Sequence, residues 1–335
     1  GEEMTETLFP AGIVGTGSYV PDRIMTNQDL EKLVDTSDEW IVTRTGIRER
    51  RIAAKEQATS DLGTIAARRA LEDAGMQAGD VDLILVATAT PDMNFPSTAC
   101  LIQNNLKAVR AAAFDVEAAC SGFLYSLSIA AQFIATGFYR NVLVIGAECL
   151  SRFTNWKDRN TCVLFGDGAG AAVVRRVEQG YGILSGTMGA DGSGGDLLKL
   201  QAGGSRLPAS QETVRNHLHY VHMEGSEVFK FAVRIMVSAA REAMDLAGIT
   251  TEDLDYLIPH QANIRIIKAA AKHLKISADK VWINLDRYGN MSAASIPVAL
   301  DEAARSGKIR KGNIICMVGF GGGLTWASSI MKWAK

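Results

Sequence analysis

The chain reads Ala70-Leu-Glu-Asp-Ala-Gly75-Met-Gln-Ala-Gly-Asp80-Val-Asp82-Leu-Ile-Leu85 and, 173 residues later, Ala243-Met-Asp-Leu-Ala-Gly248-Ile-Thr-Thr-Glu-Asp253-Leu-Asp255-Tyr-Leu-Ile258. Each copy has the pattern of a helix that ends at a glycine cap and is followed by a buried strand. Two apolar segments that end in glycine, Val142–Gly146 and Ile315–Gly319, recur at the same spacing. The sequence therefore predicts one α/β fold that has been duplicated.

The organisation of each half follows from this pattern. Strands that alternate with helices predict a mostly parallel sheet covered by helices, and sites in such sheets lie beyond the carboxyl ends of the strands. We expect two domains of similar architecture, residues 1–178 and residues 179–335. The chemistry is expected where the two halves meet.

The composition excludes several classes of protein. With 335 residues, 47% of them apolar and 21% charged, the chain is typical of a globular protein, and a formal charge of −2 gives no field for binding nucleic acid. Neither a membrane span nor a signal peptide is expected, which predicts a cytoplasmic location. Gly1-Glu2-Glu3, before Met4, are expected to be a vector remnant. The five scattered cysteines do not resemble a disulfide framework and fit a reducing compartment.

One of these cysteines stands where a nucleophile is expected. Cys120 lies in Asp115-Val-Glu-Ala-Ala-Cys120-Ser-Gly-Phe123, between an extended segment and a predicted helix from Gly122 to Thr136. The N–H groups at a helix start favour a thiolate. The alternative is a small buried apolar residue. The equivalent position in the second half is Ala293, so the fold does not itself require sulfur there.

Two polar residues of the second half are candidate partners. His260 follows a predicted strand that ends at Pro259, and Asn290 lies in a Gly-Asn turn. A lone histidine or a turn asparagine is more often structural, but an imidazole and an amide can also donate hydrogen bonds to a reacting oxygen. The glycines from Gly319 to Gly323 would let backbone N–H groups approach a carbonyl oxygen. Since cysteine occurs in one half and this histidine and asparagine in the other, we expect one composite site.

Other motifs do not support nucleotide or metal binding. Gly15-Thr-Gly17 runs into a proline and Gly166–Gly170 into a predicted strand, so neither is typical of a phosphate-binding loop. A cluster of histidines has no carboxylate or thiol at ligand spacing, and no metal site is predicted there: His217, His219 and His222.

Cys120, His260 in His-Gln-Ala-Asn263 and Asn290 in Tyr-Gly-Asn-Met-Ser-Ala-Ala-Ser together resemble the Cys-His-Asn triad of 3-oxoacyl-[acyl-carrier-protein] synthase III, the initiating condensing enzyme of bacterial type II fatty-acid synthesis. The resemblance covers essentially the whole chain, including Asp38–Arg48, Phe165–Gly170 and Phe320–Gly323. It implies a thiolase-like fold, in which two βαβαβαββ halves form five αβαβα layers, and a homodimer.

The resemblance also implies a mechanism without a cofactor. Cys120 would take the acyl group of a short acyl-CoA, expected to be acetyl-CoA, while the backbone N–H groups of Cys120 and Gly322 hold the oxyanion. His260 and Asn290 would then hold the thioester oxygen of malonyl-acyl carrier protein during loss of CO2. The carbanion would attack the acyl-cysteine and give a 3-oxoacyl carrier protein.

Further roles are implied by the same resemblance. Residues expected to bind CoA are Trp40, Arg44, Arg159 and Asn263. Residues expected to bind the acidic carrier protein are Arg265, Lys268, Lys272 and Lys230; a helix from Ile264 to Leu274 is predicted to carry the first three. Phe95 resembles the residue that a dimer partner lends to the acyl pocket. Primer length depends on this pocket and on a variable loop, residues 197–219, so the sequence leaves it open.

Several alternatives stay open or are disfavoured. A polyketide or secondary-metabolite priming synthase would share the triad and use another acyl donor. A thiolase would need a second cysteine where Phe320-Gly321 stands. A papain-like protease also orders Cys, His and Asn along its chain but lacks this architecture. A non-catalytic carrier-binding protein would not need all three polar residues.

Overall fold

Two sheets form the centre of the protein, of which the computed structural model describes residues 8–335; the predicted vector remnant Gly1-Glu2-Glu3 lies outside this part. The first sheet has the order β1-β7-β6-β4-β5, with β1 Ala11–Tyr19, β7 Asp167–Arg176, β6 Asn141–Cys149, β4 Leu83–Ala87 and β5 Ala112–Val116. The second has the order β11-β12-β13-β8, with β11 Tyr256–Pro259, β12 Ile314–Gly321, β13 Thr325–Lys332 and β8 Gly182–Ala190. Strand β4 pairs in parallel with β5 and β6, β11 pairs in parallel with β12, and the other pairs in these two sheets are antiparallel.

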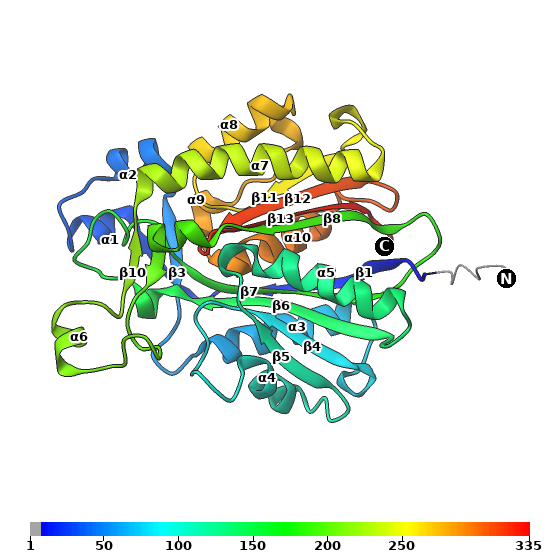
Figure 1. Cartoon of the computed structure of the whole chain (residues 1–335), viewed down its shortest axis with the longest axis horizontal. Coiled ribbons are helices and arrows are strands. Elements are labelled where there is room, and N and C mark those ends of the chain that lie inside the picture. Colours follow the sequence, from blue (N-terminus) through cyan, green and yellow to red (C-terminus); the bar gives the residue numbers. More distant parts are fainter. Residues whose placement is uncertain (1–7) are drawn as a thin grey trace.

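Helices cover both sheets and fill the space between them (Figure 1). Helices α5 (Gly122–Ala135) and α10 (Ser295–Arg305) lie between the sheets, and one apolar cluster joins them to strands of both. The outer face of the first sheet carries α3 (Thr59–Asp73) and α4 (Thr98–Leu106), and that of the second carries α7 (Gly225–Ala247) and α8 (Ile264–Leu274). The result is the five-layered αβαβα arrangement that the sequence predicts.

The duplication is visible element by element. At the spacing of 173 residues, α3 corresponds to α7, β4 to β11, α5 to α10 and β6 to β12. The first half therefore has the predicted order βαβαβαββ. The second half differs at one strand, because the counterpart of β5 is reduced to a single bridge between Leu257 and Val281. The second sheet has four strands for this reason.

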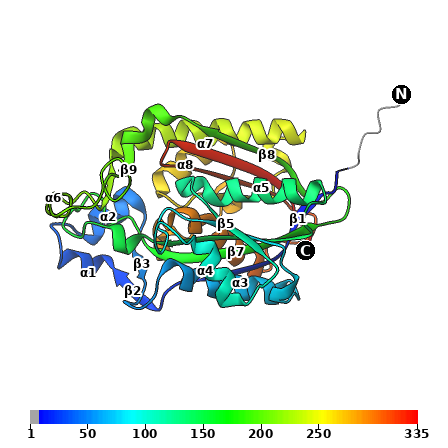
Figure 2. The ribbon, with the colours of Figure 1, turned by 60° about the horizontal axis from the view of Figure 1, so that its bottom comes forward.

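Smaller elements gather at one end of the layers (Figure 2). One group precedes α3 and consists of β2 (Arg23–Thr26), α1 (Asn27–Glu31), α2 (Asp38–Thr45) and β3 (Glu49–Ile52). The predicted loop over residues 197–219 contains β9 (Leu198–Leu200) and α6 (Gln211–Arg215), and β9 pairs with β10 (Val221–Met223). Helix α9 (Leu285–Tyr288) leads to the Asn290 turn.

Short 3-10 turns occur at intervals along the chain: η1 (Ala78–Asp80), η2 (Ala119–Ser121), η3 (Leu150–Phe153), η4 (Gly192–Leu197), η5 (Thr251–Asp253), η6 (Ala278–Lys280) and η7 (Ser292–Ala294). Among residues 8–335, none of the helices has the length and apolar character needed to span a bilayer.

Candidate active site

Two equivalent turns meet between the sheets. Turn η2 holds Cys120 at the start of α5, and η7 holds Ala293 at the start of α10. Each turn begins with a residue in the left-handed region, Ala119 with φ 48° and Ser292 with φ 50°. These are sparsely populated conformations for residues with a side chain, so the matching geometry reflects the repeated fold. Through η7, the second half places the side chain of Ser292 beside Cys120.

Gly321, at the end of β12, lies directly against the nucleophile turn. A Cβ atom at this position would lie 2.5 Å from the backbone nitrogen of Cys120, which no side chain can do. Glycine is therefore required for the strand end and the turn to approach this closely. The approach places Gly322 at the cavity beside Cys120.

A cavity of about 1010 Å³ joins the candidate residues from both halves. Cys120, His260, Asn290 and Gly322 all line it. It extends between α2, the β9–β10 pair and the starts of α7 and α8, where Trp40, Arg44, Lys230, Asn263 and Arg265 line it. The structure therefore brings together residues up to 283 positions apart, Trp40 and Gly323 among them.

His260 is held in the neutral form. It follows β11, its backbone N–H donates to the carbonyl of Val318 at 2.8 Å, and its ring packs edge-on against Phe320 with the ring centres 5.5 Å apart. Neither ring nitrogen has a hydrogen-bond partner among the described residues, and the side chain is buried. Burial lowers the pKa of His260 to about 3. A neutral imidazole with a free nitrogen can donate a hydrogen bond to a substrate oxygen.

Asn290 is fixed through its backbone and its amide oxygen. Its N–H donates to Leu164 at 2.8 Å, and its carbonyl accepts from Gly166 at 3.0 Å. The side-chain Oδ1 accepts the N–H of Ser292 at 2.8 Å. Because Oδ1 is used in this bond, Nδ2 is the group that remains to donate.

The Cys120 thiol differs from its sequence expectation. The start of α5 was expected to favour a thiolate, but burial raises the pKa of Cys120 to about 12, and the carboxylates of Glu148 and Glu117 act in the same direction. The hydrogen bond with the Ser292 hydroxyl, 3.3 Å from Sγ, opposes them. The expectation of a resting thiolate is therefore wrong, because burial outweighs the helix start.

The residues expected to bind CoA gather around one indole ring. The guanidinium of Arg44 lies 4.7 Å from the ring centre of Trp40, and that of Arg159 lies 5.3 Å from it. Asn263 caps α8 by accepting the N–H of Arg265, and its Nδ2 donates to the carbonyl of Arg44 at 3.0 Å. Asn263 therefore ties α8 to α2, a structural role that the sequence did not indicate.

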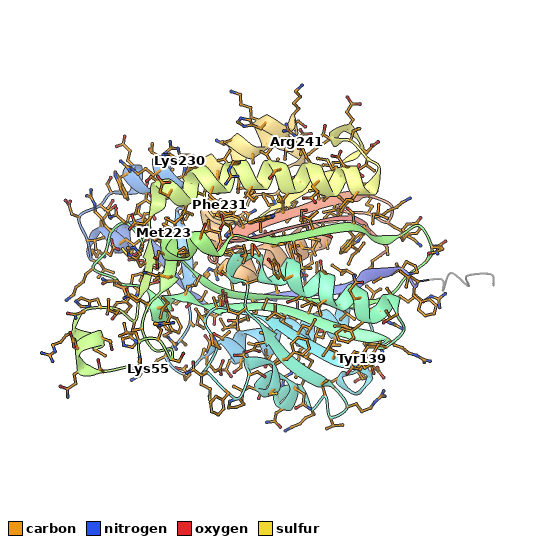
Figure 3. The ribbon with its side chains drawn as sticks, in the orientation of Figure 1. Lys55, Tyr139, Met223, Lys230, Phe231 and Arg241 are labelled. Carbon is orange, nitrogen blue, oxygen red and sulfur yellow. The ribbon has the colours of Figure 1, made fainter. Side chains whose placement is uncertain are left out.

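The residues expected to bind the carrier protein are exposed. Lys268 and Lys272 lie on the solvent side of α8, and the guanidinium of Arg265 lies 5.4 Å from the ring centre of Phe229. Lys230 stands near the start of α7 (Figure 3), where it forms an exposed ion pair with Glu227 at 3.5 Å. Of these four cations, Arg265 and Lys230 line the cavity.

Phe95 is 86% exposed and does not line the cavity of the single chain. A role in the acyl pocket requires a second subunit and stays a prediction. The described residues contain no group of three or more His, Cys, Asp or Glu side chains arranged to hold a metal ion.

Sequence reasoning missed two residues of the site, Ser292 and Glu148. Ser292 contacts the nucleophile, and Glu148 is a fully buried carboxyl on β6 next to η7. The spacing of 173 residues places Ser292 at the position of Ala119, beside the nucleophile in the repeat. The spacing of the repeat could therefore have identified Ser292 from the sequence.

The family models for 3-oxoacyl-[acyl-carrier-protein] synthase III match residues 114–192, and those for the C-terminal part of the same enzyme match residues 244–333. The beta-ketoacyl-[acyl-carrier-protein] synthase III of Caldanaerobacter subterraneus is 67% identical over 97% of this chain and 98% of its own length.

Solved structures agree with this similarity. The 3-oxoacyl-[acyl-carrier-protein] synthase III of Aquifex aeolicus is 51% identical, covers 96% of this chain and all of its own, and superposes with a TM-score of 0.89. The priming beta-ketosynthase of the R1128 polyketide pathway is 37% identical, covers all of this chain and 99% of its own, and superposes with a TM-score of 0.91.

Proposed function

Since this chain belongs to the 3-oxoacyl-[acyl-carrier-protein] synthase III family, we propose that it condenses an acyl-CoA primer with malonyl-carrier protein in the cavity described above. The members of this family are thiolase-fold acyltransferases that carry out the condensation initiating fatty-acid synthesis. The observation that carries the proposal is that a single cavity collects the thiol of Cys120, the imidazole of His260, the amide of Asn290 and the backbone of Gly322.

In the first half-reaction, Cys120 attacks the thioester carbonyl of the acyl-CoA and CoA leaves. The backbone N–H groups of Cys120 and Gly322 hold the oxyanion, each worth about 3 kcal/mol of transition-state stabilisation. The close approach that Gly321 permits supports this role, since it brings the end of β12 against the turn that holds Cys120.

In the second half-reaction, His260 and Asn290 donate hydrogen bonds to the thioester oxygen of malonyl-carrier protein. Loss of CO2 then leaves an enolate stabilised by two neutral donors. The lowered pKa of His260 and the use of Asn290 Oδ1 as an acceptor support donation by both groups. The carbanion attacks acyl-Cys120 and gives a 3-oxoacyl carrier protein two carbons longer.

The outer part of the cavity binds the two carriers. Trp40 stacks on the CoA base, with Arg44, Arg159 and Asn263 around it, and the exposed cations Arg265, Lys268, Lys272 and Lys230 bind the acidic carrier protein. Such surface charges add association rate and orientation more than affinity.

The proposal includes four finer statements. The primer is acetyl-CoA, the reaction needs no cofactor, the enzyme works in the cytoplasm, and it is a homodimer in which Phe95 completes the acyl pocket of the other subunit. Its domains are residues 1–178, with Cys120, and residues 179–335, with His260 and Asn290. One sheet is built from each of these segments, which supports the division.

A priming role in polyketide synthesis is the second candidate. The observation in its favour is the 37% identity to the R1128 priming ketosynthase, and the 67% identity to the fatty-acid enzyme favours the first.

The test is acylation of the intact enzyme. Incubation with acetyl-CoA is expected to add one acetyl group, which peptide mapping places on Cys120 and which Cys120→Ala lacks. Competition among acetyl-, butyryl-, isobutyryl- and octanoyl-CoA then ranks the primers. An intact-mass spectrum without an adduct from any short acyl-CoA would contradict the proposed priming role.

A further inference from the structure

The sulfur of Cys120 has a hydroxyl as its hydrogen-bond partner. Ser292 Oγ lies 3.3 Å from Sγ, and both side chains are buried. His260 makes no hydrogen bond with this sulfur, since neither of its ring nitrogens has a partner among the described residues. The proton of the thiol therefore has a direct path to Ser292 and none to the imidazole.

A buried carboxyl stands behind this hydroxyl. Glu148 on β6 is fully buried and forms no ion pair within residues 8–335. Its Oε1 accepts from the hydroxyl of Thr88 at 2.6 Å, from the N–H of Ala89 at 2.8 Å, and from the N–H and the hydroxyl of Thr90 at 3.1 and 2.9 Å. Its Oε2 accepts the N–H of Ala293 at 3.4 Å, and the neighbouring Ser292 hydroxyl lowers the pKa of the carboxyl.

The duplicated fold does not require this carboxyl. The equivalent of Glu148 in the other half is Gly321, which lies against the N–H of Cys120 as Glu148 lies against that of Ala293. One copy of the turn therefore faces a glycine and an open cavity, and the other copy faces a carboxyl. An acidic side chain in a fully buried position is costly, so a role in the chemistry of the neighbouring thiol explains it better than packing does.

Charge conservation indicates what that role is. Loss of the thiol proton to solvent would leave a thiolate and a carboxylate together in one buried space, which both burial and repulsion oppose. Transfer of the same proton to the carboxylate leaves the total charge of the site unchanged. Burial raises the pKa of Glu148, so this carboxylate accepts a proton more readily than an exposed carboxylate does.

We propose that Ser292 is a catalytic residue that passes the thiol proton of Cys120 to Glu148. The S–H bond breaks as its proton moves to Ser292 Oγ, and the hydroxyl proton of Ser292 moves to Glu148 Oε2. The products are a thiolate that accepts a hydrogen bond from Ser292 and a neutral carboxylic acid. The reverse transfer delivers the proton to the CoA sulfur as it leaves, so no other reactant is needed.

The other titratable groups near the sulfur do not replace this relay. Glu117 precedes η2, is exposed, and accepts the N–H of Ala119 at 2.8 Å. His260 follows β11 and is held neutral by burial. The inference rests on the proposed function in that Cys120 is the nucleophile, but its test uses an alkylating agent and no acyl substrate.

The experiment measures the alkylation of Cys120 by iodoacetamide from pH 5 to pH 10, followed by peptide mapping in a Cys100→Ser background because Cys100 is exposed. Two groups that share a proton titrate as a pair, so the wild-type rate is expected to show a pH-independent region. Glu148→Gln cannot accept the proton, and its profile is expected to rise as a single titration without that region.

Ser292→Ala and Ser292→Gly separate the hydroxyl from backbone strain. Both lack the hydroxyl, and only glycine relieves the φ of 50°. Both are expected to lower the alkylation rate in the pH-independent region by about tenfold, the loss of one hydrogen bond to a charged sulfur. Acetylation by acetyl-CoA falls in parallel, and malonyl decarboxylation changes by less than about twofold, because Asn290 bonds the backbone and not the side chain of Ser292.

Ser126→Ala is the matched control, because this serine is buried on α5 and its hydroxyl bonds only the carbonyl of Gly122. It should keep the wild-type profile. The relay is wrong if Ser292→Gly alkylates at the wild-type rate, or if both half-reactions fall equally. If Glu148→Gln fails to fold, the alkylation rates of Ser292→Ala and Ser292→Gly still test the relay. A wild-type enzyme with the pH-independent region but no acyl adduct would instead contradict the proposed function.

Discussion

At the scale of single residues, burial sets the charge of the histidine in this site. Burial lowers the pKa of His260 to about 3 from 6.5, so the unfolded chain binds a proton that the folded protein does not bind between these values. The stability contributed by this group is complete above pH 6.5 and is lost as the pH falls toward 3. We expect the free energy of unfolding of the wild type, relative to His260→Gln, to fall by about 1.4 kcal/mol per pH unit in this range.

Urea unfolding at several pH values measures this difference. His273→Gln is the control, because His273 is exposed on α8 and its replacement leaves the buried imidazole in place. A difference between wild type and His260→Gln that does not depend on pH would show that folding leaves the pKa of His260 unchanged. Burial would then not be what holds this imidazole neutral.

At the scale of elements, α8 separates packing from recognition. Its buried face, with Ile266, Ala270 and Leu274, packs in the apolar cluster against α7. The exposed Lys268 and Lys272 take no part in this packing. Changing Lys268 and Lys272 to Glu together is expected to raise the KM for malonyl-carrier protein by roughly tenfold at low salt and to leave the KM for the primer CoA within about twofold. Added salt should reduce the effect, because it screens exposed charges.

The control for α8 is Lys308→Glu with Lys311→Glu. This pair makes the same change in net charge between α10 and the start of β12, whereas the cavity lies at the other end of that strand. An equal rise in KM from the control pair, or a rise that salt does not change, would argue against docking of the carrier protein on α8.

At the scale of the whole molecule, the first sheet ends in an open edge. Strand β5 is the last strand of its sheet, Phe114 on it is 40% exposed, and the nearby segment before α4 carries Phe95 at 86%. The Asp115 carboxylate binds the first N–H groups of α4, so this segment is fixed to the strand. Exposed aromatic side chains beside an unpaired edge are typical of an interface, which supports the proposed homodimer.

Light scattering is expected to give twice the mass of one chain for the wild type. Phe114→Glu should give the mass of one chain and lose most acyl transfer, because a buried charge at an interface is costly and Phe95 no longer reaches the second subunit. Leu246→Glu, at a 64% exposed position on α7, should stay dimeric. A wild-type monomer that is fully active would contradict both the dimer and the role of Phe95.

The sequence by itself determined the duplicated α/β architecture, because glycine caps, buried strands and their spacing of 173 residues are local patterns that survive in each copy. It also selected Cys120, His260 and Asn290, which stand where strands end or helices begin. It could not show that the counterpart of β5 is reduced to one bridge, or that residues 197–219 contain β9 and α6.

Only the tertiary structure decided the electrostatics of the site. The approach of Ser292 to Cys120 depends on how α5 and α10 pack between the sheets, and residues 172 positions apart carry no local signal of contact. The pKa values of Cys120, Glu148 and His260 follow from burial, which depends on the assembled layers and not on neighbouring residues in the chain. A thiol that the sequence predicts as a thiolate is therefore a protonated group in the folded protein, and its activation depends on groups that folding brings beside it.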